Sequence, residues 1–386
     1  MSTEPGSIQV ALAQKTEGAG SRTAEDVLFA HAMNLEVHDH FEEASRAFEQ
    51  MIAILHHRGG KLARLRESVR VARFWSTHVS ESGPNTLEAF ERVQASRKAI
   101  SQLGLSVPPV VTAKIDFEIL TMSLYWTDLK MVGTELESTE AVLLLSRPSL
   151  GTRSTIALAE QKLNRFKGND ERALESAREF ASIMDQAASI GSEAVLSADR
   201  LLTNEFLWEG RLDDAAKQLE KSARFAKSDA ALDRIAIYRA DLALRRGDAR
   251  LAAELLPQIR DQSLYSSLLY TGIYGNVLCN AGQTTRGLTV MREGIRRDSA
   301  VGTYVNDPDV AYERSLVGLC ALKAQSRSLA VQCALDARRA FDDQKIVAPR
   351  YLAPLIQLEQ ALRIDAIHGP RHKEAQPAAI TTDGSC

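Results

Sequence analysis

The chain has 386 residues but only 22 glycines and 11 prolines, and it has no apolar run long enough to span a membrane. The scarcity of turn-forming residues and the lack of sustained two-residue alternation argue against a β fold. The net charge is −3, which supplies no basic field for nucleic acid or anionic lipid. These absences leave a helical protein, for which we expect neither a membrane partner nor a nucleic-acid partner.

Cysteine is also scarce, and its spacing matches no disulfide or metal framework. The four cysteines are Cys279, Cys320, Cys333 and Cys386. They form no CxxC pair and all lie in the last third of the chain. We therefore expect free thiols buried as small apolar side chains, and a cytoplasmic location.

Both ends of the chain read as polar segments without regular structure. Residues 1–22 contain Glu4 and no apolar core of a secretory signal, which predicts a disordered arm. Residues 368–386 are similarly polar and predict a disordered tail. Between these two ends, the sequence predicts one helical-repeat solenoid over residues 23–367.

An internal repeat of about forty residues decides the fold. Four glycines each have a very small residue five positions later, and these pairs are Gly168 and Ala173, Gly210 and Ala215, Gly247 and Ala252, and Gly282 and Gly287. A glycine can end a helix in the left-handed conformation, and a small residue lets the next helix approach closely. In a weaker copy of the repeat, Gln325 stands in place of the glycine. The pattern predicts about eight helix pairs, with a second helix near 248–260 and an amphipathic capping helix near 348–367.

This pattern of a turn glycine followed by a small residue resembles the tetratricopeptide repeat, which implies an all-α fold wound into an α-α superhelix. The match is best over about 150–300, although the repeats are longer than usual in that family. The longer period resembles the solenoid sensor domains of maltose-activator-type bacterial regulators. Neither a nucleotide-binding GxxxxGK[ST] motif nor a helix-turn-helix accompanies it here.

No catalytic or metal-binding arrangement is visible. The sequence contains no GxSxG and no HExxH, and His31, His38 and His40 lack the spacing of helical metal ligands. We therefore expect no enzyme, no cofactor and no metal. The basic segment 61–73 is either a charged outer helix face or a surface for an acidic partner.

The resemblance nominates residues on the concave face of the superhelix. In peptide-binding tetratricopeptide domains, the position six before the turn glycine faces the groove, and an asparagine there holds the ligand backbone through its donor and acceptor. The corresponding residues here are Lys162, Asn204, Asp241 and Asn276. Other candidates on the same faces are Arg200, Arg234 and Tyr238, with Trp208 as a further aromatic anchor. The alternative is that these residues are only the polar lining of a solvated groove.

Two functions remain open. The first is a non-enzymatic scaffold that binds a protein or peptide in the concave groove. The second is a sensory or regulatory component of a bacterial transcriptional or signalling system that lacks its own DNA-binding module. A homodimer formed through the ends of the array is also open, because imperfectly capped repeats can associate there.

Overall fold

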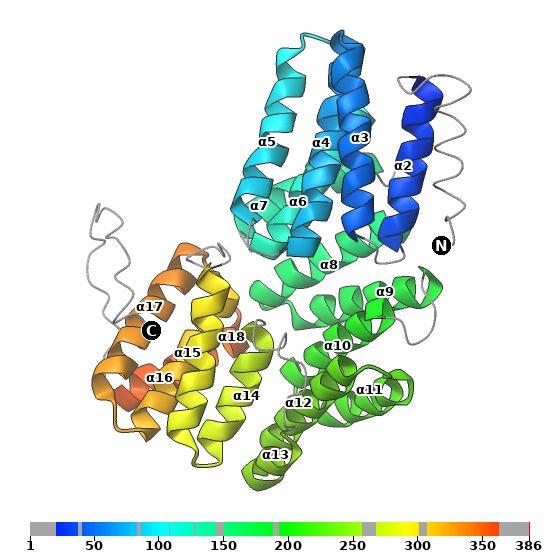
Figure 1. Cartoon of the computed structure of the whole chain (residues 1–386). Helices are drawn as coiled ribbons and strands as arrows, with labels where there is room; N and C mark the ends of the chain where they lie inside the picture. The colour runs from blue at the N-terminus through cyan, green and yellow to red at the C-terminus, as the bar shows by residue number, and fades with distance from the viewer. Residues whose placement is uncertain are drawn as a thin grey trace, which may run out of the picture. The chain divides into compact units, whose positions relative to one another are not determined.

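The computed structural model describes residues 21–37, 41–82, 86–107, 109–126, 129–143, 150–187, 193–256, 268–300, 307–362 and 386. Throughout these ranges the regular elements are α-helices joined as successive antiparallel hairpins (Figure 1). This confirms the predicted all-α fold of about eight helix pairs and one final helix. The predicted disordered arm and tail lie outside the described residues, apart from residues 21, 22 and 386.

Contacts within the chain divide it into two compact units. The sequence predicts one solenoid over residues 23–367. The first unit holds α2 (Arg22–Val37), α3 (Phe41–Arg58), α4 (Lys61–Ser82), α5 (Thr86–Gln102), α6 (Pro109–Trp126) and α7 (Leu129–Leu143). The second holds α8 (Leu150–Phe166), α9 (Asp170–Ala187), α10 (Glu193–Trp208), α11 (Leu212–Phe225), α12 (Asp229–Arg245), α13 (Ala249–Leu255), α14 (Leu268–Asn280), α15 (Thr284–Ala300), α16 (Pro308–Lys323), α17 (Arg327–Asp343) and α18 (Pro349–Leu362).

The repeat glycines close the first helix of each pair as the sequence predicts. Gly168, Gly210, Gly247 and Gly282 have φ between +73° and +87°. After α10, for example, the amide of Gly210 donates to the carbonyl of Leu207 and the amide of Arg211 to that of Phe206. This is the paired-bond termination that requires a left-handed residue after the helix. Gln325 adopts the same conformation with φ +60°, so it replaces the glycine in function.

The small residue of each repeat lies where two helices touch. Ala173, Ala215 and Ala252 have no exposed surface. At Gly287 an added Cβ would come within 2.7 Å of the Gly275 carbonyl oxygen, so the backbones of α14 and α15 meet there. Close packing of paired helices therefore explains the requirement for a small side chain at this position.

In the first unit the core follows the apolar stripes of its helices. Leu28, Phe48, Met51 and Leu55 pack together between α2 and α3, with exposures of 1% or less. A second cluster joins α4, α5 and α6 through Val93 and the side chains packed around it. Burial of each large apolar side chain contributes about 1.5–3 kcal/mol to folding, which is ample to fix these hairpins.

In the second unit, α13 is the exception to the regular pairs. The sequence predicts a second helix near 248–260, but α13 has 7 residues and ends at Leu255. Leu256 is extended, with ψ 120°, because it precedes Pro257 and the proline ring disfavours the helical conformation there. The side chain of Asp248 caps the start of α13 by accepting from the Leu251 amide.

The last helix, α18, has the apolar face expected of a cap. Its buried residues are Tyr351, Pro354, Leu355, Leu358 and Leu362. On its other side Glu359 accepts two hydrogen bonds from Arg338 of α17. The predicted capping helix is thus confirmed up to Leu362.

Candidate functional site

The four positions six residues before the turn glycines lie on the first helices of successive pairs in the second unit. Asn204 is 7% exposed and Asp241 is 5% exposed, whereas Lys162 and Asn276 are half-buried. The helices that hold them are α8, α10, α12 and α14. We call one set of side chains on these helices and on α16 the inner cluster: Gln161, Lys162, Arg165, Asn204, Glu205, Trp208, Asp241, Arg245, Asn276, Asp309, Tyr312 and Glu313.

The first part of the inner cluster joins α8 to α10 and α16. Glu205 accepts hydrogen bonds from Gln161 Nε2 at 2.6 Å and from Arg165 Nε at 2.9 Å. The ammonium of Lys162 lies 3.9 Å from a carboxylate oxygen of Asp309 at the start of α16. Lys162 is therefore engaged with an acid of its own chain.

The second part is centred on Asp241 of α12. Arg245, one turn later, donates from Nε to this carboxylate at 2.9 Å and from a terminal nitrogen to the Leu207 carbonyl of α10 at 3.2 Å. The same guanidinium faces the hydroxyl of Tyr312 on α16. Asp241 thus holds Arg245 in position to link α10, α12 and α16.

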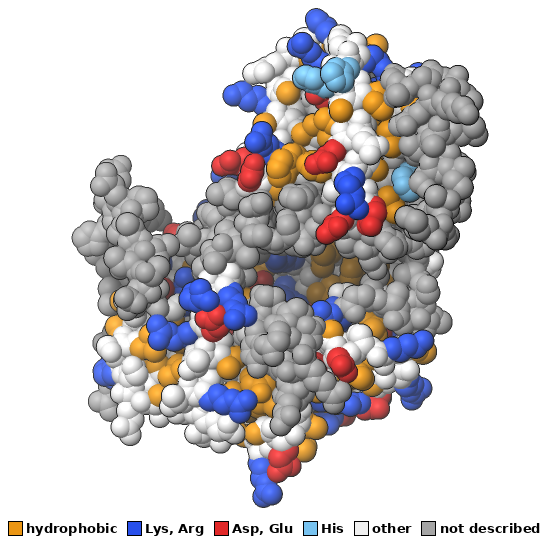
Figure 2. Space-filling view, viewed as in Figure 1, with side chains coloured by type: hydrophobic (Ala, Val, Ile, Leu, Met, Phe, Trp, Pro, Cys, Tyr) orange, Lys and Arg blue, Asp and Glu red, His pale blue; other side chains and the backbone are white. Residues whose placement is uncertain are grey.

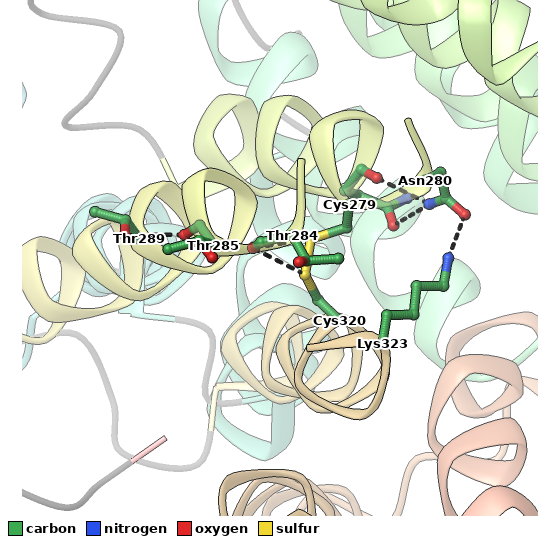
Figure 3. Close-up of a disulfide and its surroundings, with 8 residues drawn as sticks. Cys279, Asn280, Thr284, Thr285, Thr289, Cys320 and Lys323 are labelled. Atoms are coloured by element: carbon green, nitrogen blue, oxygen red, sulfur yellow. Dashed lines mark hydrogen bonds between the residues drawn. A yellow bond between two sulfur atoms is a disulfide. The ribbon is translucent and has the colours of Figure 1, made fainter. Parts of the chain in front are cut away.

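Asn276 belongs to a chain of polar contacts along the ends of α14 and α16. Its side-chain oxygen accepts from Asn280 Nδ2 at 3.0 Å, and Asn280 in turn accepts from Lys323 Nζ at 2.7 Å (Figure 3). The Asn276 amide nitrogen takes no part in these two bonds. Asn276 therefore keeps a donor that the Asn280–Lys323 link does not use.

Asn204 differs from Asn276 in its hydrogen bonding, because its carboxamide forms no hydrogen bond with any other described residue. One turn later on α10, Trp208 stacks on Tyr351 of α18 and lies 4.9 Å from the ring of Tyr312. An asparagine with unused donor and acceptor beside an aromatic cluster suits recognition of a peptide group.

Two further predicted residues border this cluster, and one lies in the core. Arg200 donates to Ser197 on its own helix at 2.6 Å, and Arg234 lies 5.8 Å over the ring of Tyr270. Tyr238 is 1% exposed and packs with the apolar core of α10, α12 and α14. Burial raises the pKa of Tyr238, so the phenol stays neutral.

Glu313 of α16 is a buried acid that is not among the site residues predicted from the sequence. It is 5% exposed, and its Oε2 has no hydrogen-bond partner among the described residues. Burial and the carboxylates of Asp309 and Asp241 raise the pKa of Glu313 well above its ordinary value. Glu313 lies between Ala311 and Ser315, which are also buried in α16, and an acid between two small residues was the available signal.

The cysteines overturn the expectation of free thiols. Cys279 of α14 is bonded to Cys320 of α16 (Figure 3). Cys333 of α17 is bonded to Cys386. Their Cα atoms are 5.7 Å and 5.0 Å apart, which is the normal range for disulfides. The prediction was wrong because the partners come from different helices, which only the folded chain brings together.

The basic segment 61–73 lies on α4 and points partly inward. Arg66 pairs with Glu25 at 2.8 Å, Arg70 lies 3.5 Å over the ring of Phe29, and Arg73 pairs with Glu118 at 3.5 Å. Basic and acidic side chains are interspersed on the face seen in Figure 2. The segment therefore serves mainly to connect helices of the first unit.

The described residues contain no group of three or more His, Cys, Asp or Glu side chains that could hold a metal ion. His38 and His40 lie outside them. A cavity of 480 Å³ lies between α11, α12 and α13, and another of 390 Å³ lies beside His56 and Trp75 of the first unit. Neither cavity is lined by a predicted site residue.

No protein-family model matches the chain, and no curated protein matches its sequence. Its fold is similar to that of a Rap protein complexed with competence and sporulation factor, at 10% identity and a TM-score of 0.57 over 88% of this chain and 98% of that one. It is also similar to the apo form of the quorum sensor NprR from B. thuringiensis, at 13% identity and a TM-score of 0.52 over 90% and 99%. A third similar structure is phAimR with its ligand, at 11% identity and a TM-score of 0.51 over 94% and 98%.

These similarities and the repeat geometry define the class of protein. The chain is a tetratricopeptide-like helical repeat protein, which confirms the resemblance predicted from its glycine spacing. The narrower resemblance to maltose-activator solenoids stays a prediction. In the part of the chain that the structure describes, no helix combines the length and apolar character needed to cross a bilayer.

Proposed function

We propose that this chain is a non-enzymatic binding protein that captures a peptide, or an extended segment of a partner protein, on the inner cluster of its second unit. The observation that carries the proposal is Asn204, a residue that is 7% exposed and whose carboxamide bonds to no other described residue. A peptide backbone offers the donor and acceptor that such a group needs. Trp208 and Tyr312 supply the adjoining apolar surface.

The similar structures support this proposal through what their own names state. One is a complex with competence and sporulation factor, and another is a complex with a ligand. All three cover nearly the whole of this chain. Because their identities are 10–13%, they suggest a mode of binding and leave the ligand of this chain to be found.

A sensory role is the second candidate, and the similarity to a protein described as a quorum sensor favours it. On this proposal, a captured peptide would change how the chain acts on a regulatory partner. A cytoplasmic location is retained as part of the proposal. The two disulfides weigh against the reasoning that led to it, since such bonds persist mainly in oxidising compartments.

The test is the double variant Asn204→Ala with Asn276→Ala. We expect it to lose capture of synthetic peptide pools by the immobilised chain while its melting temperature stays nearly unchanged. Asn169→Ala is a matched control, because Asn169 is exposed in the turn after α8. A large fall in melting temperature for the double variant would show that these asparagines are structural and would remove them from the binding site.

A further inference from the structure

The inner cluster contains three acids that are each paired with a base, and one further acid that has no ion pair with a described residue. Three carboxylates each have a cation of their own, and these pairs are Glu205 with Arg165, Asp241 with Arg245, and Asp309 with Lys162. Glu313 is the fourth carboxylate, and no ion pair with a described residue balances it. The cluster is therefore complementary to one additional positive charge.

The surroundings of Glu313 provide space for its carboxylate but no hydrogen-bond partner for its buried Oε2. The carboxylate lies against the Cα of Gly272 on α14, where any side chain would collide with both of its oxygens. The carboxylates of Asp309 and Asp241 disfavour a negative charge at Glu313 and, after burial, raise its pKa. An unpaired buried acid of this kind costs stability, and a close cation would offset that cost.

The groups near Glu313 indicate which kind of cation could pair with its carboxylate. The described residues offer no set of ligands for a metal ion. Oε2 of Glu313 has no hydrogen-bond partner among the described residues. A guanidinium or an ammonium group would supply both a hydrogen-bond donor and a positive charge to this carboxylate.

We propose that Glu313 is the anchor for a positively charged group of the bound peptide, either an arginine side chain or the terminal amine. This inference rests on the proposed function, because it names the chemistry of the ligand at the same site. In the complex, the cation pairs with Glu313 as a carboxylate. A proton held by Glu313 in the free protein leaves to solvent when the cation binds, so the charges balance.

The experiment uses the full chain, immobilised, with two matched pairs of random hexapeptide pools. One pair differs by arginine or citrulline at a fixed position, and the other by a free or an acetylated terminus. We expect the wild type to retain the cationic member of one pair about tenfold more than its neutral counterpart, as for one charged hydrogen bond. Glu313→Gln should abolish this preference, while Glu254→Gln, which removes an exposed charge from α13, should keep it.

Each outcome separates this inference from the proposed function. Equal retention of the charged and neutral pools by the wild type would overturn the cation anchor and leave peptide capture standing. A preference that survives in Glu313→Gln would also overturn it, since another group would then hold the cation. No retention of any pool would reject peptide capture itself and the anchor with it. Release of more protons by the wild type than by Glu313→Gln, measured by calorimetry in two buffers, would support the anchor.

Discussion

Trp208 and Tyr351 stack face to face, with ring planes 6° apart and centroids separated by 4.8 Å. Trp208 ends α10 and Tyr351 lies in the first turn of α18, so the contact joins an early pair of the second unit to its last helix. Arg350 strengthens the same junction by donating to the Trp208 carbonyl. The last helix therefore closes on the inner cluster and supports the aromatic side of the proposed site.

Tyr351→Ala should destabilise the protein by about 3–5 kcal/mol, because it leaves a cavity where a buried ring contacts Phe166, Trp208, Tyr312 and Phe341. Urea unfolding followed by circular dichroism measures the loss. Tyr351→Phe should cost only about 1 kcal/mol, since it keeps the ring and removes the hydroxyl that donates to Asp309. Equal losses in the two variants would mean that the hydrogen bond, and not the stacking, holds α18.

Gln325→Gly should stabilise the protein by about 1 kcal/mol. Gln325 has φ +60°, where an L-residue is strained and glycine is not, and its side chain is exposed. Gly210→Ala is the reverse control, because φ is +73° and an added Cβ would meet no atom within 4 Å. Its loss should therefore report the backbone alone, again about 1 kcal/mol. Urea midpoints that fail to move in opposite directions would contradict the common role of the two positions.

The glycine spacing predicts the fold well because it encodes local rules. A left-handed residue ends a helix, and a small residue five positions later permits close pairing, whatever the rest of the chain does. The spacing also places Lys162, Asn204, Asp241 and Asn276 at equivalent positions on successive helices. It cannot reveal Glu313 or its neighbours, because those contacts join α12, α14 and α16 across the superhelix.

The disulfides also could not be predicted from local sequence rules, because each joins cysteines that are far apart in the chain. Purified without reductant and denatured, the protein should have no thiol that reacts with an alkylating reagent, and reduction should expose all four. Cys279→Ser with Cys320→Ser should lower stability by about 2–4 kcal/mol, since the bond closes a loop with a sequence separation of 41. Four reactive thiols before reduction would restore the expectation of free cysteines drawn from the sequence.

Glu313 should make the stability of the protein depend on pH. Burial and the nearby carboxylates of Asp309 and Asp241 raise the pKa of Glu313 in the folded state. Below the unfolded pKa of about 4.3, both states hold the proton and Glu313 has no effect. As the pH rises above that value, the unfolded state loses the proton first, so the wild type loses stability at up to about 1.4 kcal/mol per pH unit until the folded pKa is reached.

Glu313→Gln removes this dependence, so its advantage over the wild type should be near zero at pH 4 and should grow toward pH 8. Urea unfolding at intervals across that range measures the difference. Glu254→Gln should track the wild type, because Glu254 lies on the exposed side of α13. Parallel curves for the wild type and Glu313→Gln would mean that Glu313 is ionised at little cost in the folded protein. The carboxylate would then already be balanced, and a cationic ligand would gain nothing by pairing with it.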